Sequence, residues 1–197
     1  MPRHRHIPND LKKLYEIHDY RHAAAILACE FPVECSEIFG VLRSFRFSEA
    51  QLLKGGGNES EIPKSFSGSL RPLGWKEGKL KAKFLVDEEE VTSDTHKIDY
   101  IKNKIAFDLE WNSKDQTFDR DLYSFRAFFE YQRISVGILV TRSQELDLLF
   151  KRLRIFSKYG ASTTHLGKLL PRLQAGRSGG CPVLVFGITT KLLETLK

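Results

Sequence analysis

The stretch from residue 96 to residue 112, HKIDYIKNKIAFDLEWN, places the strongest constraint on the fold of this chain. On both sides of Asn103-Lys104, apolar residues alternate with polar ones, which is the period of a strand that buries one face. Asn adopts the left-handed backbone conformation that a tight turn requires, although Lys is a poor second residue for such a turn. We therefore predict an antiparallel hairpin closed at Asn103-Lys104.

Three carboxylates interrupt this hairpin, and the predicted register gathers them on one face. Pairing about the turn places Asp99 opposite Asp108 and Lys97 opposite Glu110, and these four side chains share a face because side chains alternate along a strand. The other face then holds a consistent apolar set, namely Ile98, Tyr100, Phe107 and Leu109.

The opposed aspartates Asp99 and Asp108 require a partner. Directly opposed Cβ atoms lie about 4.5–5.5 Å apart, and like charges at that separation destabilise a sheet. Such a pair either shares a proton or holds a cation, and carboxylate oxygens suit a hard divalent ion such as Mg²⁺. The alternative is a solvated acidic face that pairs with nearby lysines, which are residues 97, 102, 104 and 114.

Helical and strand patterns follow one another along the rest of the chain. Helices are predicted over 9–30 (capped by Asn9 or Asp10), after Pro32, over 119–132 and over about 143–157, and strands over 79–87, 133–142 and 181–188. Residues 55–60, GGGNES, are predicted to be a loop without a phosphate-binding role, because no Gly-Lys-Ser/Thr follows. This alternation indicates an α/β layer fold, and we expect Trp75, Trp111 and Tyr131 in its core.

Length and composition are typical of one domain. The 197 residues, 41% of them hydrophobic, suffice for a substantial core. The three cysteines have no metal-finger spacing, and their odd number argues against a disulfide framework. We see no signal-peptide pattern and no apolar segment near the roughly 20 residues of a membrane span. We therefore expect a cytoplasmic protein without a membrane partner.

Positive charge is concentrated at the C-terminal end. Residues 151–197 contain nine Lys or Arg and one acid, Glu194, so this end carries +8 and the first 150 residues carry −2 of the net +6. Such a distribution fits a surface that binds a polyanion, or a solvated surface that is merely basic. We divide the single domain, residues 1–197, into a mostly helical part (1–75), a sheet core with the acids (76–142) and a basic part (143–197).

The acids stand in a pattern that resembles a nuclease signature. Asp99, followed nine positions later by Asp108-Leu109-Glu110, resembles the PD-(D/E)xK motif with Glu in place of the final Lys. The longer segment HKID…IAFDLEWNSKDQTFDRDLYSFRAFFEYQRISVGILVTR resembles, more particularly, the BglII-like type II restriction endonucleases. The resemblance runs from about Leu73 to Arg142 and more weakly through GGCPVLVFGI.

This resemblance implies a fold, an activity and partners. The family has a mixed central β-sheet flanked by helices and acts as a homodimer on double-stranded DNA in the cytoplasm of a bacterial or archaeal cell. Its members hydrolyse phosphodiester bonds with Mg²⁺, for which Mn²⁺ can substitute. Asp99 and Asp108 match metal-binding residues, the carbonyl group of Leu109 matches a backbone ligand, and Glu110 matches the third catalytic position.

Two features of the resembled site are not settled by the motif. Members carry a Glu on an early helix beside the site, for which Glu37 in ECSEIFGVL is our candidate, with rivals Glu30, Glu34 and Glu49. The missing signature Lys leaves the cation and the water to do more, unless Lys97 or Lys114 supplies the charge.

The basic part then contains candidate DNA contacts. The segment SKYGASTTHLGKLLPRLQAGRSGG combines hydroxyl groups, basic residues and glycines, which suit contacts with phosphates and base edges. Our candidates are Ser162, Thr163, Thr164, His165, Lys168, Arg172 and Arg177. The alternative interpretation of this segment is a helix followed by a solvated loop.

We weigh three functions. The main prediction is a sequence-specific, Mg²⁺-dependent DNA endonuclease that leaves 5′-phosphate and 3′-hydroxyl ends. One rival is a structure-specific repair or resolving nuclease of the same fold. The other is a catalytically inactive DNA-binding protein, although such a protein has no reason to keep mutually repelling acids. The recognition sequence, the cut position and the number of metal ions do not follow from the motif.

Overall fold

A mixed sheet of six strands forms the centre of the computed structural model, which describes residues 5–54, 60–160 and 162–194. The strand order is β1-β8-β7-β6-β5-β2, and β6, β7 and β8 run parallel to one another while the other neighbours pair antiparallel. The strands are β1 (Tyr15–Tyr20), β2 (Lys76–Gly78), β5 (Ile98–Lys102), β6 (Ile105–Glu110), β7 (Val136–Arg142) and β8 (Val183–Ile188).

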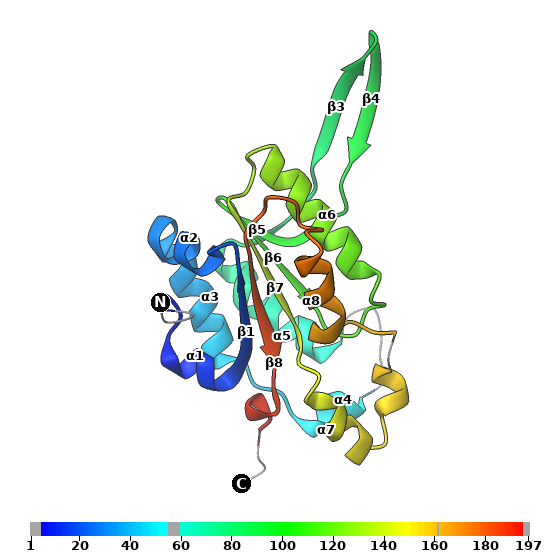
Figure 1. The fold of residues 1–197 in the computed structure, drawn as a ribbon. Coiled ribbons are helices and arrows are strands. Elements are labelled where there is room, and N and C mark those ends of the chain that lie inside the picture. Colours follow the sequence, from blue (N-terminus) through cyan, green and yellow to red (C-terminus); the bar gives the residue numbers. More distant parts are fainter. Residues whose placement is uncertain (1–4, 55–59, 161, 195–197) are drawn as a thin grey trace.

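Helices cover both faces of this sheet, as Figure 1 shows. One side carries α1 (Asn9–Leu14), α2 (Ala23–Glu30), α3 (Pro32–Ser44) and α5 (Glu61–Leu70), and the other carries α6 (Thr117–Glu130) and α8 (Leu166–Gln174). The shorter elements are α4 (Glu49–Leu53), α7 (Leu146–Arg152) and the 3-10 turns η1 (Arg71–Leu73), η2 (Phe156–Tyr159) and η3 (Thr190–Leu192). The predicted α/β class with a mixed, helix-flanked sheet is confirmed.

Two apolar cores result from this layering, one on each face of the sheet. Every residue of β7 is buried, and its side chains alternate between the core with α3 and the core with α6. Helix α6 approaches the sheet closely because Gly137 leaves room for Phe125: a Cβ atom at Gly137 would lie 2.5 Å from the phenyl ring. This close packing fixes α6 over β6 and β7.

The predicted helix over 9–30 is wrong in its middle. Residues Tyr15–Tyr20 form β1, which pairs antiparallel with β8 along its whole length. Arg21 and His22 then take positive φ angles of 55° and 59°, which separate the strand from α2. The open edge of β8 satisfies the backbone of this segment, so tertiary pairing overrides the helical spacing of its apolar residues.

The other expected elements are largely present. The strands over 79–87, 133–142 and 181–188, the helix after Pro32 and the helix over 119–132 are confirmed with small shifts of their ends. The helix over 143–157 is shorter, since α7 covers only Leu146–Arg152. Of the predicted loop 55–60, residues 55–59 lie outside the described residues. Trp75 and Trp111 are core residues, whereas Tyr131 is 43% exposed, so its assignment to the core is wrong.

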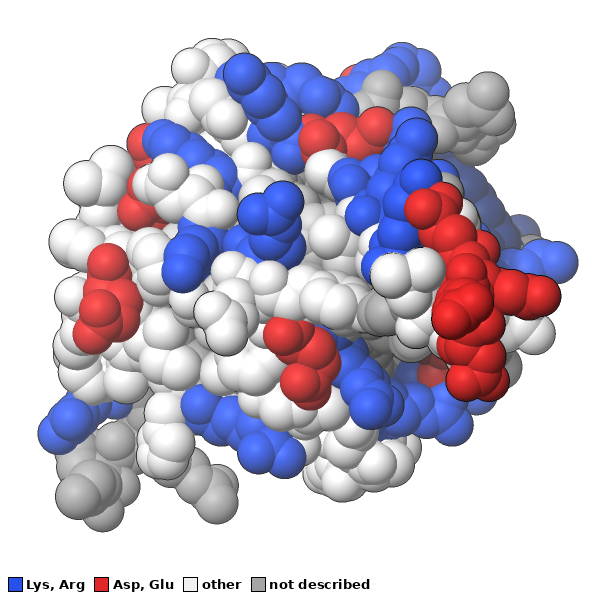
Figure 2. Space-filling view, turned by 90° about the horizontal axis from the view of Figure 1, so that it is seen from above, with Lys and Arg blue, Asp and Glu red and all other residues white. Residues whose placement is uncertain are grey.

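A separate hairpin projects from this body (Figure 1). Strands β3 (Lys81–Val86) and β4 (Glu89–Asp94) pair only with each other, and residues 87–90 at their turn are four consecutive acids. Figure 2 looks down on this end of the molecule and shows Lys and Arg spread over the face, with the largest group of acidic side chains at one side. In the described part of the chain, no helix is long and apolar enough to cross a bilayer.

Candidate active site

The hairpin that carries the acids forms with the predicted register. The backbone pairs are Tyr100 with Phe107, Ile101 with Ala106 and Lys102 with Ile105. Asn103 has the predicted left-handed conformation, with a φ angle of 50°. The turn chemistry of Asn therefore determines the register near the turn.

Regular pairing ends before the opposed aspartates. The main-chain N–H of Asp99 donates to Oδ1 of Asp108 at 2.7 Å, so a side chain takes the place of a backbone acceptor. Between its pairs with β2, strand β5 advances three residues, from Ile98 to Ile101, while β2 advances two. This β-bulge turns Ile98 into the core under α6, so the prediction that Ile98 shares a face with Tyr100 is wrong.

The acids of β6 are buried, and this burial raises their pKa values. Asp108 is 2% exposed, and burial, together with the charges of Asp99 and Glu110, raises its pKa well above the ordinary value. Glu110 is 8% exposed, and burial raises its pKa to about 7, although hydrogen bonding with Ser113 and Asp121 partly offsets the rise. Asp99 is exposed, so the cluster opens to solvent at that side chain.

Helix α6 adds a fourth acid, Asp121, which the motif did not indicate. It is 5% exposed, and burial, followed by the charges of Asp108, Glu110 and Asp99, raises its pKa to about 10. The sequence does contain a signal for it: an Asp stands at a position of DRDLYSF whose helical neighbours are apolar and face inward. A charged residue within a buried helical stripe is a candidate for function.

One carboxylate oxygen of each buried acid lacks a hydrogen-bond partner among the described residues. These atoms are Oδ2 of Asp108, Oε2 of Glu110 and Oδ2 of Asp121. Buried carboxylates without partners are unfavourable in a protein interior. In the described ranges, no three His, Cys, Asp or Glu side chains are already arranged as a metal site. The donor chemistry nevertheless fits a hard divalent cation, which takes carboxylate and carbonyl oxygens.

Glu37 is not part of this cluster. Its carboxylate accepts hydrogen bonds from Nε1 of Trp75 at 2.9 Å and from Nζ of Lys102 at 2.5 Å. Helix α3 covers the face of the sheet opposite to α6, so the prediction that Glu37 completes the acid cluster is corrected. Of its rivals, Glu34 accepts from Asn103 at the hairpin turn and Glu49 pairs with Arg152.

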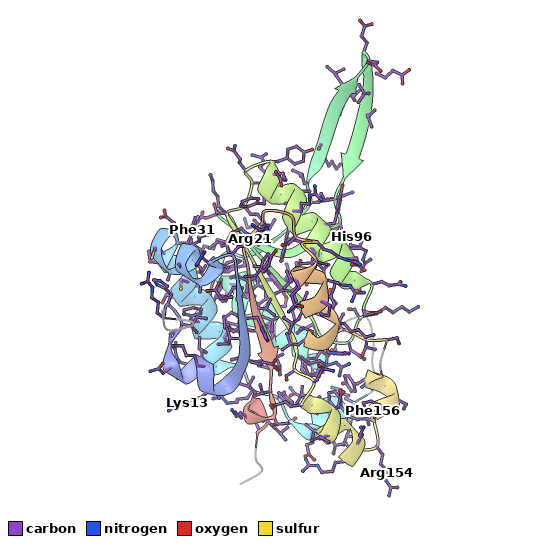
Figure 3. The ribbon with its side chains drawn as sticks, in the orientation of Figure 1. Lys13, Arg21, Phe31, His96, Arg154 and Phe156 are labelled. Atoms are coloured by element: carbon purple, nitrogen blue, oxygen red, sulfur yellow. The ribbon has the colours of Figure 1, made fainter. Side chains whose placement is uncertain are left out.

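The expected substitutes for the signature Lys lie elsewhere. Nζ of Lys97 contacts a carboxylate oxygen of Glu77 at 2.7 Å, and Lys114 is exposed in a short bridge with Thr163. Arg120 is the cation whose charge lowers the pKa of Glu110 and Asp121, but its guanidinium group contacts His96 and Thr117. Figure 3 shows His96 beside α6.

The loop after β6 joins this acid cluster to the basic part of the chain. The N–H of Asp115 donates to the carbonyl of Ser162, and the N–H of Thr164 donates to the carbonyl of Ser113, both at 2.9 Å. Residues 162–164 therefore lie directly beyond the end of β6. The structure brings the predicted DNA-contact segment next to the acids of β6, although Ser162 follows Glu110 by 52 positions along the chain.

Arg142 anchors Tyr159, Thr163 and Thr164 by hydrogen bonds from the protein interior. Its fully buried guanidinium group donates to the carbonyl groups of Thr164 and Tyr159 and to the hydroxyl group of Thr163, and it pairs with Asp147. Thr164 is buried and Thr163 is bound to Arg142, so neither hydroxyl is presented outward. Ser162 is exposed. Arg142 is a second residue that the sequence analysis did not identify.

The remaining candidates differ in how they are held. His165 is mostly buried, with its pKa lowered by burial and by the charge of Arg142, and its Nδ1 has no partner among the residues described. Arg172 contacts Asp119 at 3.1 Å and Asp115 at 3.4 Å and is largely covered. Lys168 lies 3.9 Å from Asp115, and the half-exposed Arg177 pairs with Asp119. Of His165, Lys168, Arg172 and Arg177, Lys168 and Arg177 are thus the most open to a ligand.

Comparison with known proteins covers most of the chain. A family model described as restriction endonuclease BglII/BglIII matches residues 15–188. No curated protein sequence gives a significant match. The matched range begins with the first residue of β1 and ends with the last residue of β8, so it includes the whole six-stranded sheet and all four acids.

Proposed function

Because the chain belongs to the BglII/BglIII family of restriction endonucleases, which are type II site-specific deoxyribonucleases, we propose that it cuts double-stranded DNA with a divalent cation held by its acid cluster. The cation is Mg²⁺, with Mn²⁺ as a substitute. The observation that carries this proposal is the set of buried carboxylates on β6 and α6, each with one oxygen that has no partner in the described structure. We also treat the chain as one catalytic domain, since β1 and β8, from its two ends, are neighbours in one sheet.

The residues of the hairpin divide the work of hydrolysis. Asp99 and Asp108 hold the cation, together with the carbonyl oxygen of Leu109, as the family resemblance implies. When bound, the cation supplies charge neutralisation at the phosphate and makes water a better nucleophile. Glu110 orients the attacking water and accepts its proton, a role for which a pKa near neutrality is suited. The new P–O bond forms as the bond to the 3′ oxygen breaks, which leaves a 5′-phosphate and a 3′-hydroxyl.

DNA contact is proposed for the surface beside the acid cluster. Ser162, Lys168 and Arg177 are its exposed or half-buried members. Arg172 and His165 are more deeply buried residues next to this surface. The described part of the chain contains one set of these active-site carboxylates, whereas cleavage of both strands of a symmetric site takes two. We therefore propose a two-fold homodimer on a palindromic site.

Plasmid digestion tests the activity. We expect discrete fragments with Mg²⁺ or Mn²⁺, no cleavage in EDTA, and sequenced ends that carry 5′-phosphates. The Asp108→Asn protein is the matched inactive control. Cleavage that persists in EDTA, or cleavage of branched DNA alone, would contradict the proposal.

Sedimentation of the complex with a short cognate duplex tests the assembly. We expect two chains per duplex. One chain per duplex at saturation would contradict the dimer while leaving the assignment of the acids intact.

A further inference from the structure

Asp121 lies among the other acids although it comes from a different element. It belongs to α6, and the carboxylates whose charges act on it are Asp108, Glu110 and Asp99, all from the hairpin. Asp121 is only 5% exposed, and its Oδ2 has no partner within the described part of the chain. An acid in this position is repelled by its neighbours and hidden from water.

The charge of Arg120 lowers the pKa of Asp121, but no cation in the described part of the chain forms an ion pair with it. Arg120 is adjacent in sequence, but its guanidinium group is engaged with His96 and Thr117 on the outer side of α6. None of the ion pairs found among the described residues includes Asp108, Glu110 or Asp121. A buried carboxylate with neither a cation nor a full set of hydrogen bonds destabilises the fold.

Packing does not explain Asp121 either. Its helical neighbours Phe118, Leu122 and Phe125 are fully buried in the core between α6 and the sheet. An apolar residue would extend this core, and an amide would avoid the repulsion. The same packing holds α6 rigidly, because Phe125 sits over Gly137, so the Asp121 carboxylate is held in place beside β6.

We propose that Asp121, the fourth carboxylate of the active site, is a third cation-binding carboxylate, supplied by α6 and facing Asp108 and Glu110. This inference rests on the proposed divalent-cation chemistry and deepens it. Hydrated divalent cations such as Mg²⁺ keep several waters, so Asp121 binds the ion directly or through one water of its shell. In both cases, removing the charge of Asp121 weakens binding of the ion, whether or not DNA is present.

Binding of Mn²⁺ alone, measured by electron paramagnetic resonance on the DNA-free protein, provides the test. We expect Asp121→Asn to weaken Mn²⁺ affinity by about 10–100-fold, the range seen when an outer-shell partner of a metal site is removed. Glu130→Gln is the matched control, because Glu130 is an exposed acid at the end of the same helix. Its affinity for Mn²⁺ should equal that of the unaltered protein.

Thermal melting in EDTA separates this result from misfolding. Because the raised pKa keeps Asp121 uncharged in the metal-free protein and the amide matches its size, the metal-free melting temperature of Asp121→Asn should equal or exceed that of the unaltered protein. Asp121→Ser serves as a second variant if the first does not fold. If Asp108→Asn loses Mn²⁺ and both Asp121 variants retain the affinity of the unaltered protein, the inference is overturned and the proposed function stands. If the unaltered protein itself binds no Mn²⁺, the proposed function fails.

Discussion

The main-chain N–H of Asp99 donates a 2.7 Å hydrogen bond to Oδ1 of Asp108. This bond occupies one oxygen of Asp108 and leaves Oδ2 without a partner among the described residues. The two aspartates differ in exposure: Asp108 is buried, and Asp99 reaches solvent. The two acids therefore differ in environment although they lie on paired strands.

Asp108→Asn should abolish cleavage while keeping the fold. The amide preserves the oxygen that accepts from the N–H of Asp99 but removes the charge that holds the cation. Loss of the cation raises the activation free energy by several kcal/mol and thus lowers the rate by about three orders of magnitude or more. Single-turnover cleavage of a cognate duplex measures this loss, and Asp99→Ala should behave in the same way. Cleavage at the rate of the unaltered protein by either variant would remove these residues from the site.

Glu110 should make the metal-free protein less stable as the pH rises. Folding raises the pKa of Glu110 from 4.5 to about 7, so between these values the folded chain keeps a proton that the unfolded chain has lost. The stabilisation is complete below about 4.5 and is lost as the pH rises through about 7. Each pKa unit corresponds to about 1.4 kcal/mol, so the change is at most roughly 3 kcal/mol.

Melting curves in EDTA across this pH range measure the effect. In Glu110→Gln, the portion of the pH dependence that arises from Glu110 should disappear. The raised pKa of Asp108 still contributes, and Asp121, whose pKa is raised to about 10, contributes at higher pH. Identical pH profiles for the two proteins would show that Glu110 titrates normally.

Lys168→Ala should weaken binding to all DNA sequences alike. If Lys168 contacts a phosphate, its loss reduces the slope of log affinity against log salt by about 0.9. Lys13→Ala is a suitable control, because Lys13 is an exposed cation on α1, away from α8 (Figure 3). A slope that changes equally in both variants would indicate a general charge effect.

Arg177→Ala should relax specificity at one base pair. Arg177 is half exposed, lies between Gly176 and Gly179, which both have positive φ, and pairs with Asp119 in the free protein. A base contact would cost about 1–3 kcal/mol at the contacted position when it is lost. Titration against cognate and single-mismatch duplexes decides this: an equal loss of affinity for both would restrict Arg177 to the DNA backbone.

Arg142→Ala should destabilise the protein by about 3–5 kcal/mol. The substitution removes a buried charge and leaves the groups that were hydrogen-bonded to it without a partner. Arg142 is fully buried and binds two carbonyl groups, one hydroxyl group and Asp147. Arg142→Lys should recover only part of this loss, since a single ammonium group cannot reach all of these acceptors. Urea unfolding of the three proteins gives the free energies, and a loss below 1 kcal/mol for Arg142→Ala would contradict this role.

The sequence by itself determined the hairpin, its turn and the register next to that turn, the α/β class and the family. These features depend on short-range patterns: the alternation on both sides of Asn103, the conformational tolerance of Asn, and the spacing of Asp99, Asp108 and Glu110. The resemblance was sufficient to identify the acids of the hairpin because all of them lie in one continuous segment.

Tertiary structure alone decided which distant residues join that segment. Tyr15–Tyr20 is a strand because the edge of β8 is open to it, and Glu37 leaves the acid cluster because α3 covers the opposite face of the sheet. Asp121 enters the cluster because α6 packs tightly over Gly137, and Thr164 is buried because Arg142 binds its carbonyl group. Each outcome depends on a contact between residues far apart in the sequence, whose free energy no local pattern contains.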